Sequence, residues 1–372
     1  MLSTDENIFI EGSEVRQRMR DYGKLVEELH IIVKNQKSKT KNQNFGNVFI
    51  YPANGYIKIF RTGAKLISQF PRVSISRLVI TSQDPFELGL IAYLLKKKFN
   101  LPLQLQVHTD FLSLYFQQES VRNKIKVVLG KWLVKKADGL RVVSERIKDS
   151  LCFELQVLSS KITVLPIVYD MERFKTGAVK IDLRRKYPDR FIILMATRLA
   201  REKNIGLAIR AMAEVVKVCP QALLLIVGSG PEHTNIKSQI LGLKLQEDVV
   251  MENWSDDIIS YYRTADLFLL TSNYEGGARS PAEAMASGLP VVMTDVAPAG
   301  ETIINGKNGF VVLVGDYRQL ADKLIELASD AGKLAIFKKQ SLAMAVGFIT
   351  KEVYLKLYYQ ALTNALTQKN YE

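Results

Sequence analysis

The sequence of 372 residues contains few cysteines and no long apolar segment. Cys152 and Cys219 are its only cysteines and lie in different halves of the chain, which excludes a disulfide framework and a four-cysteine metal site. No apolar run approaches the roughly eighteen residues that cross a bilayer, and the N-terminus lacks the basic and then apolar order of a signal peptide. These absences predict a cytoplasmic protein.

Acidic residues are scarce in the first half of the chain. Residues 1–180 hold 29 Lys and Arg against 17 Asp and Glu, whereas residues 181–372 hold 22 against 21. Nearly all of the net charge of +13 therefore lies in the first half. A one-sided basic surface predicts an anionic partner, which could be a lipid surface, a nucleic acid or a phosphorylated acceptor. Nucleic acid is the weaker alternative, because the sequence has no helix-turn-helix, zinc ligands or aromatic ribonucleoprotein motif.

Short apolar runs alternate with helical stretches along the whole chain. This alternation predicts an α/β protein with doubly wound parallel sheets, and the length suits two domains. We expect residues 34–44, which are polar and basic, to form an exposed loop. The predicted strands include residues 48–51, 78–81, 103–107, 140–143 and 162–165, followed by 191–196, 223–227, 249–252, 267–270 and 291–294.

A glycine loop follows the buried strand Leu267–Leu270 and leads into a predicted helix with Ser280 as its N-cap. Backbone N–H groups and the helix dipole would point at one spot there, which predicts an anion site. Glu275 and Glu283 flank this site. Because carboxylates repel an anion, we expect the two to accept hydrogen bonds from neutral hydroxyls, such as those of a sugar. The alternative is that Glu283 belongs to a capping box and Glu275 is an ordinary loop carboxylate.

Charged and polar residues also follow two other predicted strands. Arg198 and Lys203 lie between a strand and the helix 205–218, and cations in that position predict a diphosphate site. The alternative is two solvated charges. His108 directly follows the strand 103–107, where a neutral imidazole could donate to a sugar hydroxyl or the reacting oxygen, or could bond a loop carbonyl.

Two further segments have more than one interpretation. Gly228, Ser229 and Gly230 follow a strand, but His233 stands where a dinucleotide fingerprint has its third glycine, which disfavours a dehydrogenase. A basic amphipathic helix begins near Val121 and could contact an anionic membrane or pack on a sheet with its lysines solvated. The apolar face of that helix consists of Val121, Ile125, Val128, Leu129, Trp132 and Leu133.

The order of the strand-end His, the Arg/Lys loop and Glu275-x7-Glu283 resembles the retaining, nucleotide-sugar-dependent glycosyltransferases of family four. The resemblance implies the GT-B fold, in which two Rossmann-like doubly wound domains face a central cleft. It implies domains at residues 1–175 and 176–349, with a final helix over 350–372 that packs back on the first. Catalytic residues by this resemblance are His108, Arg198, Lys203 and Glu275, and substrate-binding residues are Gly12, Gly276, Gly277, Ala278, Arg279, Ser280 and Glu283.

The same resemblance places Glu275 near the transferred sugar, Glu283 on the ribose, and Arg198 and Lys203 on the donor diphosphate. Gly12 is a departure, since the family has a glycine pair there, and a plain turn is its alternative. No Asp-x-Asp occurs, so we expect no metal, with Arg198 and Lys203 in the place of a metal ion. We expect no cofactor.

The expected activity is therefore transfer of a hexose from a nucleoside-diphosphate sugar to a lipid-linked or cell-envelope glycan acceptor, with retention implied by the resemblance alone. Expected partners are the nucleotide sugar, that acceptor and an anionic membrane surface reached through the basic N-terminal half, on the inner face of the membrane. We expect no nucleic-acid partner. The alternative activity is that of a GT-B nucleotide-sugar epimerase-like enzyme, which would transfer no sugar.

Overall fold

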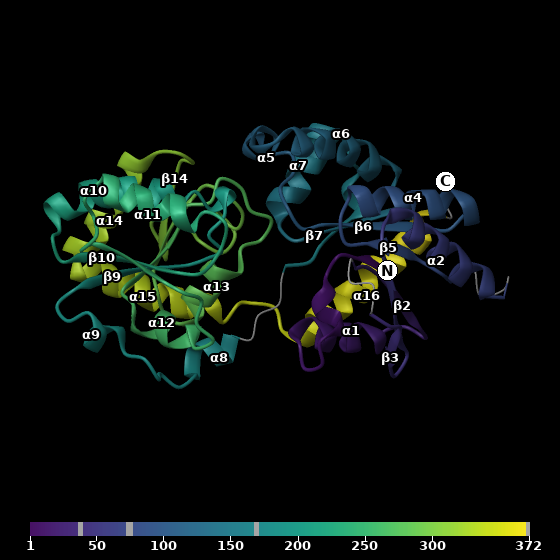
Figure 1. The fold of residues 1–372 in the computed structure, drawn as a ribbon, viewed down its shortest axis with the longest axis horizontal. Helices are drawn as coiled ribbons and strands as arrows, with labels where there is room; N and C mark the ends of the chain where they lie inside the picture. The colour runs from purple at the N-terminus through teal and green to yellow at the C-terminus, as the bar shows by residue number, and fades with distance from the viewer. Residues whose placement is uncertain (36–39, 72–76, 167–170, 370–372) are drawn as a thin grey trace. The chain divides into compact units, whose positions relative to one another are not determined.

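The chain forms two compact units in its computed structural model, which describes residues 1–35, 40–71, 77–166 and 171–369. One unit contains residues 1–166 and 349–372, and the other contains residues 167–348 (Figure 1). The first boundary lies directly after Pro166 in the structure, whereas the sequence suggested a boundary after residue 175. The reason is α8 (Met171–Thr176), whose Phe174 is buried in the core of the second unit against Tyr262.

In the described residues, the N-terminal unit contains an eight-stranded sheet in the order β3-β4-β2-β1-β5-β6-β7-β8. All pairings are parallel except that of β3 with β4. The strands are β1 (Leu2–Ser3), β2 (Leu29–Lys34), β3 (Gln43–Phe45), β4 (Val48–Ala53), β5 (Ile80–Ser82), β6 (Leu103–Val107), β7 (Gly139–Val142) and β8 (Ile162–Val164). The helices are η1 (Glu6–Phe9), α1 (Glu14–Gly23), α2 (Tyr56–Gln69), α4 (Glu87–Phe99), α5 (Leu114–Glu119), α6 (Val121–Lys136), α7 (Glu145–Leu155), η2 (Ser159–Lys161) and α16 (Lys351–Lys369).

The strand β3 corrects the expectation that residues 34–44 form only an exposed loop. Gln43 and Asn44 pair with β4 at the edge of the sheet. An edge strand with polar side chains buries little apolar surface, so no hydrophobic pattern marks it in the sequence. Residues 36–39 of the predicted loop lie outside the described residues.

The second unit contains a six-stranded sheet in the order β11-β10-β9-β12-β13-β14, parallel throughout its described residues. Its strands are β9 (Phe191–Ala196), β10 (Ala222–Val227), β11 (Val249–Glu252), β12 (Leu267–Leu270), β13 (Val291–Thr294) and β14 (Gly309–Val312). The helical segments are α8, α9 (Leu183–Lys186), η3 (Arg201–Lys203), α10 (Ile205–Val218), α11 (His233–Gly242), α12 (Ile258–Thr264), α13 (Arg279–Ala286), α14 (Tyr317–Ser329) and α15 (Ala331–Ala345).

Both faces of this second sheet are buried, which explains its continuous apolar strands. In β9, Ile193 and Met195 join the core that includes α10, whereas Ile192 and Leu194 join the core that includes α12 and α13. Parallel strands covered by helices on both faces have this composition. The sequence therefore predicted β9 to β13 closely, whereas β14 was not predicted.

The strand order of the second sheet reverses between β9 and β12. The connection from β9 leads through α10 to β10 on one side, whereas β12 and β13 lie on the other side. Ligands of open α/β sheets bind outside the carboxyl ends of the strands at such a switch point. The loops after β9 and β12 therefore border the expected ligand position of this unit.

The helix α16 packs on β6, β7 and β8 of the N-terminal unit. Gly139 allows this approach, because a Cβ atom there would lie only 2.9 Å from the Cβ of Ala365. The face of the sheet beneath α16 is polar, with Gln104, Gln106 and Arg141 all buried. A helix from the far end of the chain thus covers polar groups in the N-terminal unit.

Candidate active site

The loop between β12 and α13 has the predicted position, but α13 begins two residues earlier than expected. Its N-cap is Ala278, which offers no side-chain hydrogen bond, and Arg279 is the first helical residue. Ser280 is therefore not the N-cap, and Glu283 lies in the second turn, too far along for a capping box. Pro281 occupies the third helical position, where a missing N–H still costs no intrahelical bond.

Glu275 and Lys203 come together from separate loops. The Nζ of Lys203 lies 2.5 Å from Oε1 of Glu275, and the hydroxyl of Ser272 donates to the same oxygen at 2.7 Å. Both charged side chains are partly buried. Lys203 and Glu275 therefore form one partly buried charged pair, and their roles toward a substrate stay predictions.

Several hydrogen bonds fix the loop after β9 against the loop after β12. The hydroxyl of Thr271 donates to the carbonyl oxygens of Lys203 and Asn204 at 2.9 and 3.1 Å. The side chain of Asn204 donates to that of Asn273 at 2.8 Å, and the Asn273 amide donates to the Glu202 carbonyl at 2.8 Å. The pair of Lys203 and Glu275 is thus held by backbone contacts at the switch point and does not depend on two side chains alone.

Arg198 lies on the same loop as Lys203, but its guanidinium pairs with a carboxylate other than Glu275. Its guanidinium forms an ion pair with Glu202, four residues on, and the side chain is 69% exposed. Glu202 is the partner that sequence reasoning missed, although an i,i+4 spacing of opposite charges could have suggested it. Each of the two predicted cations therefore has a carboxylate partner in this structure.

A third loop, at the end of β10, packs closely on the loop after β9. A Cβ atom at Gly228 would lie 1.8 Å from the carbonyl oxygen of Thr197, and one at Gly230 would lie 2.3 Å from that of Leu199. The Leu199 amide donates to the Ser229 carbonyl at 2.9 Å. The two glycines are thus required for close backbone approach, and the signal was a glycine pair directly after a buried strand.

Glu283 faces two side chains from the same unit. The hydroxyl of Tyr262, on α12, donates to Oε2 at 3.1 Å, and Nε of Arg279 lies 3.5 Å from Oε1. Burial and the Glu283 carboxylate raise the pKa of Tyr262 well above its usual value, so this hydroxyl remains a donor. The second Glu of the predicted motif is therefore an oriented carboxylate in the second turn of α13.

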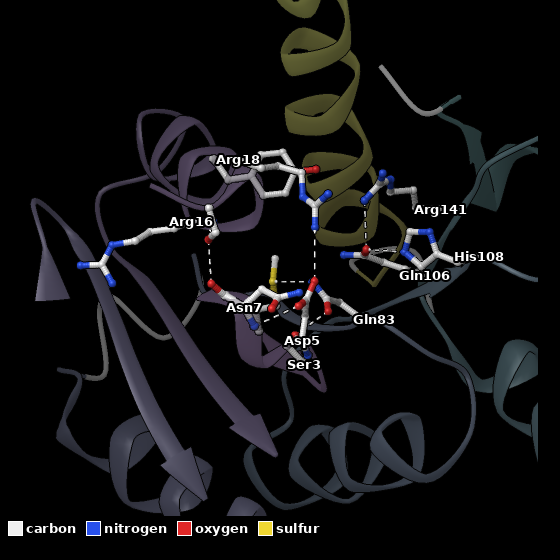
Figure 2. Close-up of polar contacts among 12 residues, drawn as sticks. Ser3, Asp5, Asn7, Arg16, Arg18, Gln83, Gln106, His108 and Arg141 are labelled. Carbon is white, nitrogen blue, oxygen red and sulfur yellow. Dashed lines mark hydrogen bonds and ion pairs between the residues drawn. The ribbon is translucent and has the colours of Figure 1, made fainter. Parts of the chain in front are cut away.

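His108 directly follows β6 in the N-terminal unit, and its neighbours define its tautomer. Its Nε2 lies 3.1 Å from Oε1 of Gln106, which also accepts a hydrogen bond from Arg141 at 2.9 Å (Figure 2). A guanidinium only donates, so the shared atom of Gln106 is its carbonyl oxygen, and Nε2 of His108 must carry the hydrogen. The remaining nitrogen, Nδ1, is then an acceptor. The structure thus favours a ring that accepts from a hydroxyl, where the sequence suggested a donor.

The His108 ring is neutral at pH 7. Desolvation by the surrounding protein, and then the positive charges of Arg141 and Arg18, lower its pKa to about 3. The side chain keeps an exposed surface, so a hydroxyl can reach it. Neutrality is consistent with the single tautomer that Gln106 selects.

Arg141 is a buried cation that is held by neutral groups. Its Nη1 donates to Gln106, and its Nη2 donates to the hydroxyl of Tyr354 on α16 at 2.7 Å. The Tyr354 hydroxyl lies 2.5 Å from that of Tyr22, and the guanidinium also lies over the ring of Tyr358, 5.2 Å from its centroid. A chain of contacts therefore runs from α16 through Arg141 and Gln106 to His108.

Gly12 lies in an exposed turn between η1 and α1 with a φ of +79°. This left-handed backbone favours glycine without any ligand. Ser13, the next residue, is the N-cap of α1 and accepts from the Arg16 amide at 3.2 Å. The plain-turn alternative thus explains Gly12, and its role toward a substrate stays a prediction.

Residues 180–344, within the second unit, match the family model described as Glycosyl transferases group 1. The poly(glycerol-phosphate) alpha-glucosyltransferase of Bacillus subtilis is 33% identical over 158 residues, which are 42% of this chain and 24% of that protein. The Staphylococcus aureus capsular polysaccharide biosynthesis glycosyltransferase CapM is 28% identical over 201 residues, 52% of this chain and 53% of that protein. The chain therefore spans about a quarter and about half of these two relatives.

Solved structures resemble the chain over nearly its whole length. Anabaena HepE in complex with UDP has a TM-score of 0.75 at 18% identity, with 97% of this chain and 98% of that chain covered. The sucrose-phosphate synthase of Thermosynechococcus elongatus has a TM-score of 0.76 at 18% identity, with 96% and 98% covered. At this identity the likeness concerns the fold, and the predicted fold class is confirmed. Residues 180–344 are therefore similar to the glycosyl transferases group 1 family, and the chain has the GT-B fold.

Proposed function

We propose that the chain transfers a hexose from a nucleoside-diphosphate sugar to a lipid-linked or cell-envelope glycan acceptor, with retention of anomeric configuration. The observation that carries this proposal is the charged pair of Lys203 and Glu275, held at the switch point by loops after β9 and β12. It lies within the unit that matches the family model.

The names of similar proteins support both substrates of the proposal. Structures of Anabaena HepE hold UDP or UDP-glucose. One relative from Escherichia coli, 24% identical over 74% of this chain, is a galactosyltransferase that uses UDP-Gal and a diphosphoundecaprenol-linked sugar. Another, from Streptococcus pneumoniae, is an alpha-monoglucosyldiacylglycerol synthase. The names of these similar proteins thus include both a sugar nucleotide as donor and a lipid-bound acceptor.

Negative charge builds on the departing diphosphate during the reaction, and fixed positive groups at that place lower the barrier. Lys203 suits this role because an ammonium has three donors and can contact a phosphate oxygen while it still contacts Glu275. The exposed Arg198 can exchange Glu202 for a phosphate, to which its planar guanidinium offers two donors. Residues 276–280, at the start of α13, add backbone N–H groups and the positive end of the helix.

The two carboxylates of the motif have separate proposed roles. Glu275 holds Lys203 and lies beside the reacting sugar, whereas Glu283 accepts hydrogen bonds from the ribose hydroxyls. The Tyr262 hydroxyl orients Glu283 by donating to one of its oxygens, and the other oxygen lies 3.5 Å from Nε of Arg279. Transfer proceeds without a metal ion in this proposal, because Lys203 and Arg198 supply the charge.

A two-step experiment tests the proposal. Nucleotide sugars are first screened for thermal stabilisation, where a donor at 100 times its Kd should add about 2.7 kcal/mol. The stabilising donor is then incubated with and without lipid-linked and glycan acceptors, and products are identified by mass spectrometry. We expect sugar transfer that requires an acceptor and falls in Lys203→Met, with the exposed Lys217→Met as matched control. Conversion of the donor to an isomer without acceptor would instead indicate the epimerase-like enzyme, and stabilisation by none of the donors would refute the proposal.

A further inference from the structure

The outer face of α6 carries an apolar stripe that the fold leaves exposed. Val121, Ile125, Val128 and Trp132 are 74%, 64%, 72% and 42% exposed, respectively. At 3.6 residues per turn, these four side chains fall within about 60° of one another around the helix. The buried side of α6 is formed by Val127, Gly130, Leu133 and Val134 instead. The alternative in which the whole apolar face packs on the sheet is therefore wrong for four of its six residues.

Basic residues border the stripe on both sides. Lys124, Lys131 and Lys135 lie along one edge by helical position, whereas Arg122 and Lys136 lie along the other. Residues 114–136 hold six Lys and Arg against one Glu, a net charge of +5. This arrangement of apolar side chains between two rows of cations suits the boundary between the acyl chains and the headgroups of an anionic bilayer.

Neighbouring helices extend the exposed apolar surface. The helix α5, which packs against α6, exposes Leu114 and Tyr115. On α4, the ring of Tyr93 meets that of Trp132 edge to face, with centroids 4.9 Å apart. Exposed apolar surface of this kind marks an interaction site. Among the described residues, no helix has the length and apolarity needed to cross a bilayer.

We propose that the outer face of α6 binds an anionic lipid bilayer, with its apolar stripe among the upper acyl chains and its lysines at the lipid phosphates. Charge complementarity decides between this occupant and a second copy of the chain. A second copy would bring the same +5 segment against itself, and like charges at an interface oppose association. An anionic lipid surface attracts each of these residues, with about a fivefold gain in binding for each Lys or Arg near the surface.

The tryptophan content allows a direct test. The sequence has two tryptophans, Trp132 in α6 and Trp254 in the second unit, so Trp254→Phe leaves Trp132 as the only indole reporter. Vesicles of phosphatidylcholine with phosphatidylglycerol should shift its emission to shorter wavelength and protect it from a water-soluble quencher. Vesicles of phosphatidylcholine alone should do so more weakly. The converse variant Trp132→Phe should show no shift, because its reporter lies in the other unit.

Two sets of substitutions separate the apolar and the ionic contributions. Ile125→Ser with Val128→Ser should abolish co-sedimentation with the anionic vesicles, whereas Val218→Ser with Ile336→Ser, at equally exposed positions in the second unit, should leave it unchanged. Lys124→Gln with Lys135→Gln should weaken binding roughly 25-fold at low salt. Thermal stabilisation by the donor nucleotide sugar should persist in all of these variants, which shows that they are folded and separates this surface from the proposed donor site.

Three results would overturn the proposal. The first is an unchanged emission of Trp132 with anionic vesicles. The second is a shift in the emission of Trp254 in the Trp132→Phe variant, which would assign vesicle binding to the second unit. The third is sedimentation that reveals a dimer lost in Ile125→Ser with Val128→Ser, which would show that a second copy covers the stripe.

Discussion

The pair of Lys203 and Glu275 should be energetically coupled, and a double-mutant cycle can measure the coupling. Removing one partner of a fully buried ion pair costs about 3–5 kcal/mol, because the other charge remains unpaired. The side chains here are 18% and 13% exposed, so water screens part of that cost, and we expect about 2 kcal/mol for Lys203→Met. Glu275→Gln keeps the size of the side chain and an oxygen to accept from Ser272, so it should cost about 1 kcal/mol.

The double variant should lose less than the sum of the two single changes. Once Glu275 is neutral, Lys203→Met leaves no unpaired carboxylate, so we expect a coupling energy of about 1–2 kcal/mol. Urea unfolding provides the measurement, with Trp254 fluorescence in a Trp132→Phe background as the signal of the second unit. The slope with denaturant should stay constant, so that the shift in midpoint reports stability alone.

An exposed ion pair gives the matched control for this cycle. Lys217 and Glu214 lie on α10 with 2.7 Å between charged atoms, but their side chains are 64% and 44% exposed. The corresponding cycle on that pair should give less than about 0.5 kcal/mol. A coupling near zero for Lys203 and Glu275, equal to that of the control, would refute the interpretation of these residues as one charged unit.

Three other changes probe the loops and the network around His108. Gly228→Ala should destabilise the second unit by about 2–3 kcal/mol, measured by urea unfolding, since its Cβ would meet the Thr197 carbonyl oxygen at 1.8 Å. Tyr354→Phe should cost about 2 kcal/mol by thermal unfolding, because it removes the acceptor for a buried N–H of Arg141. His108 has a folded pKa near 3, below its unfolded value of about 6.5, so the unfolded chain binds more protons between these values. Its contribution to stability should therefore fall as pH drops below about 6.5, and His108→Asn should remove that slope from the pH dependence of unfolding.

The first two of these changes each have a control at a related position. Gly242→Ala should be tolerated, because a Cβ atom there meets nothing within 4 Å. Tyr359→Phe, on the exposed side of α16, should change stability by less than about 0.5 kcal/mol. Loss of stability in the controls equal to that in the test variants would contradict the reasoning. NMR signals of His108 that titrate near pH 6.5 in the folded protein would contradict the pKa argument.

The sheet of the second unit was predictable because burial on both faces leaves a strong apolar signal. The bounds of β9, β11, β12 and β13 agree with the predicted strands. The start of α13 was not predictable in the same way. Ser280 offered a good capping side chain, yet Ala278 takes the cap position with no side-chain hydrogen bond. A good capping side chain at Ser280 therefore did not decide where this helix begins.

The sequence predicted where the candidate site residues lie, because they follow the ends of predicted strands. It did not predict which side chains they contact. Lys203 and Glu275 are 72 residues apart, and their pairing depends on the order of β9 and β12 in the sheet. The contacts of Arg141 and Gln106 depend on α16, which arrives from the far end of the chain. A single sequence gives the chemistry of such groups but not which distant element covers them.

The return of α16 to the N-terminal unit has a consequence for the order in which the chain can mature during translation. Residues 167–348 can leave the ribosome and form their own sheet, while the sheet beneath α16 still displays Arg141 and Gln106 to water. The N-terminal unit completes its interior only when α16, which is synthesised after residues 167–348, docks on it. A chain that ends before residue 349 would therefore have a folded second unit and an N-terminal unit that lacks α16.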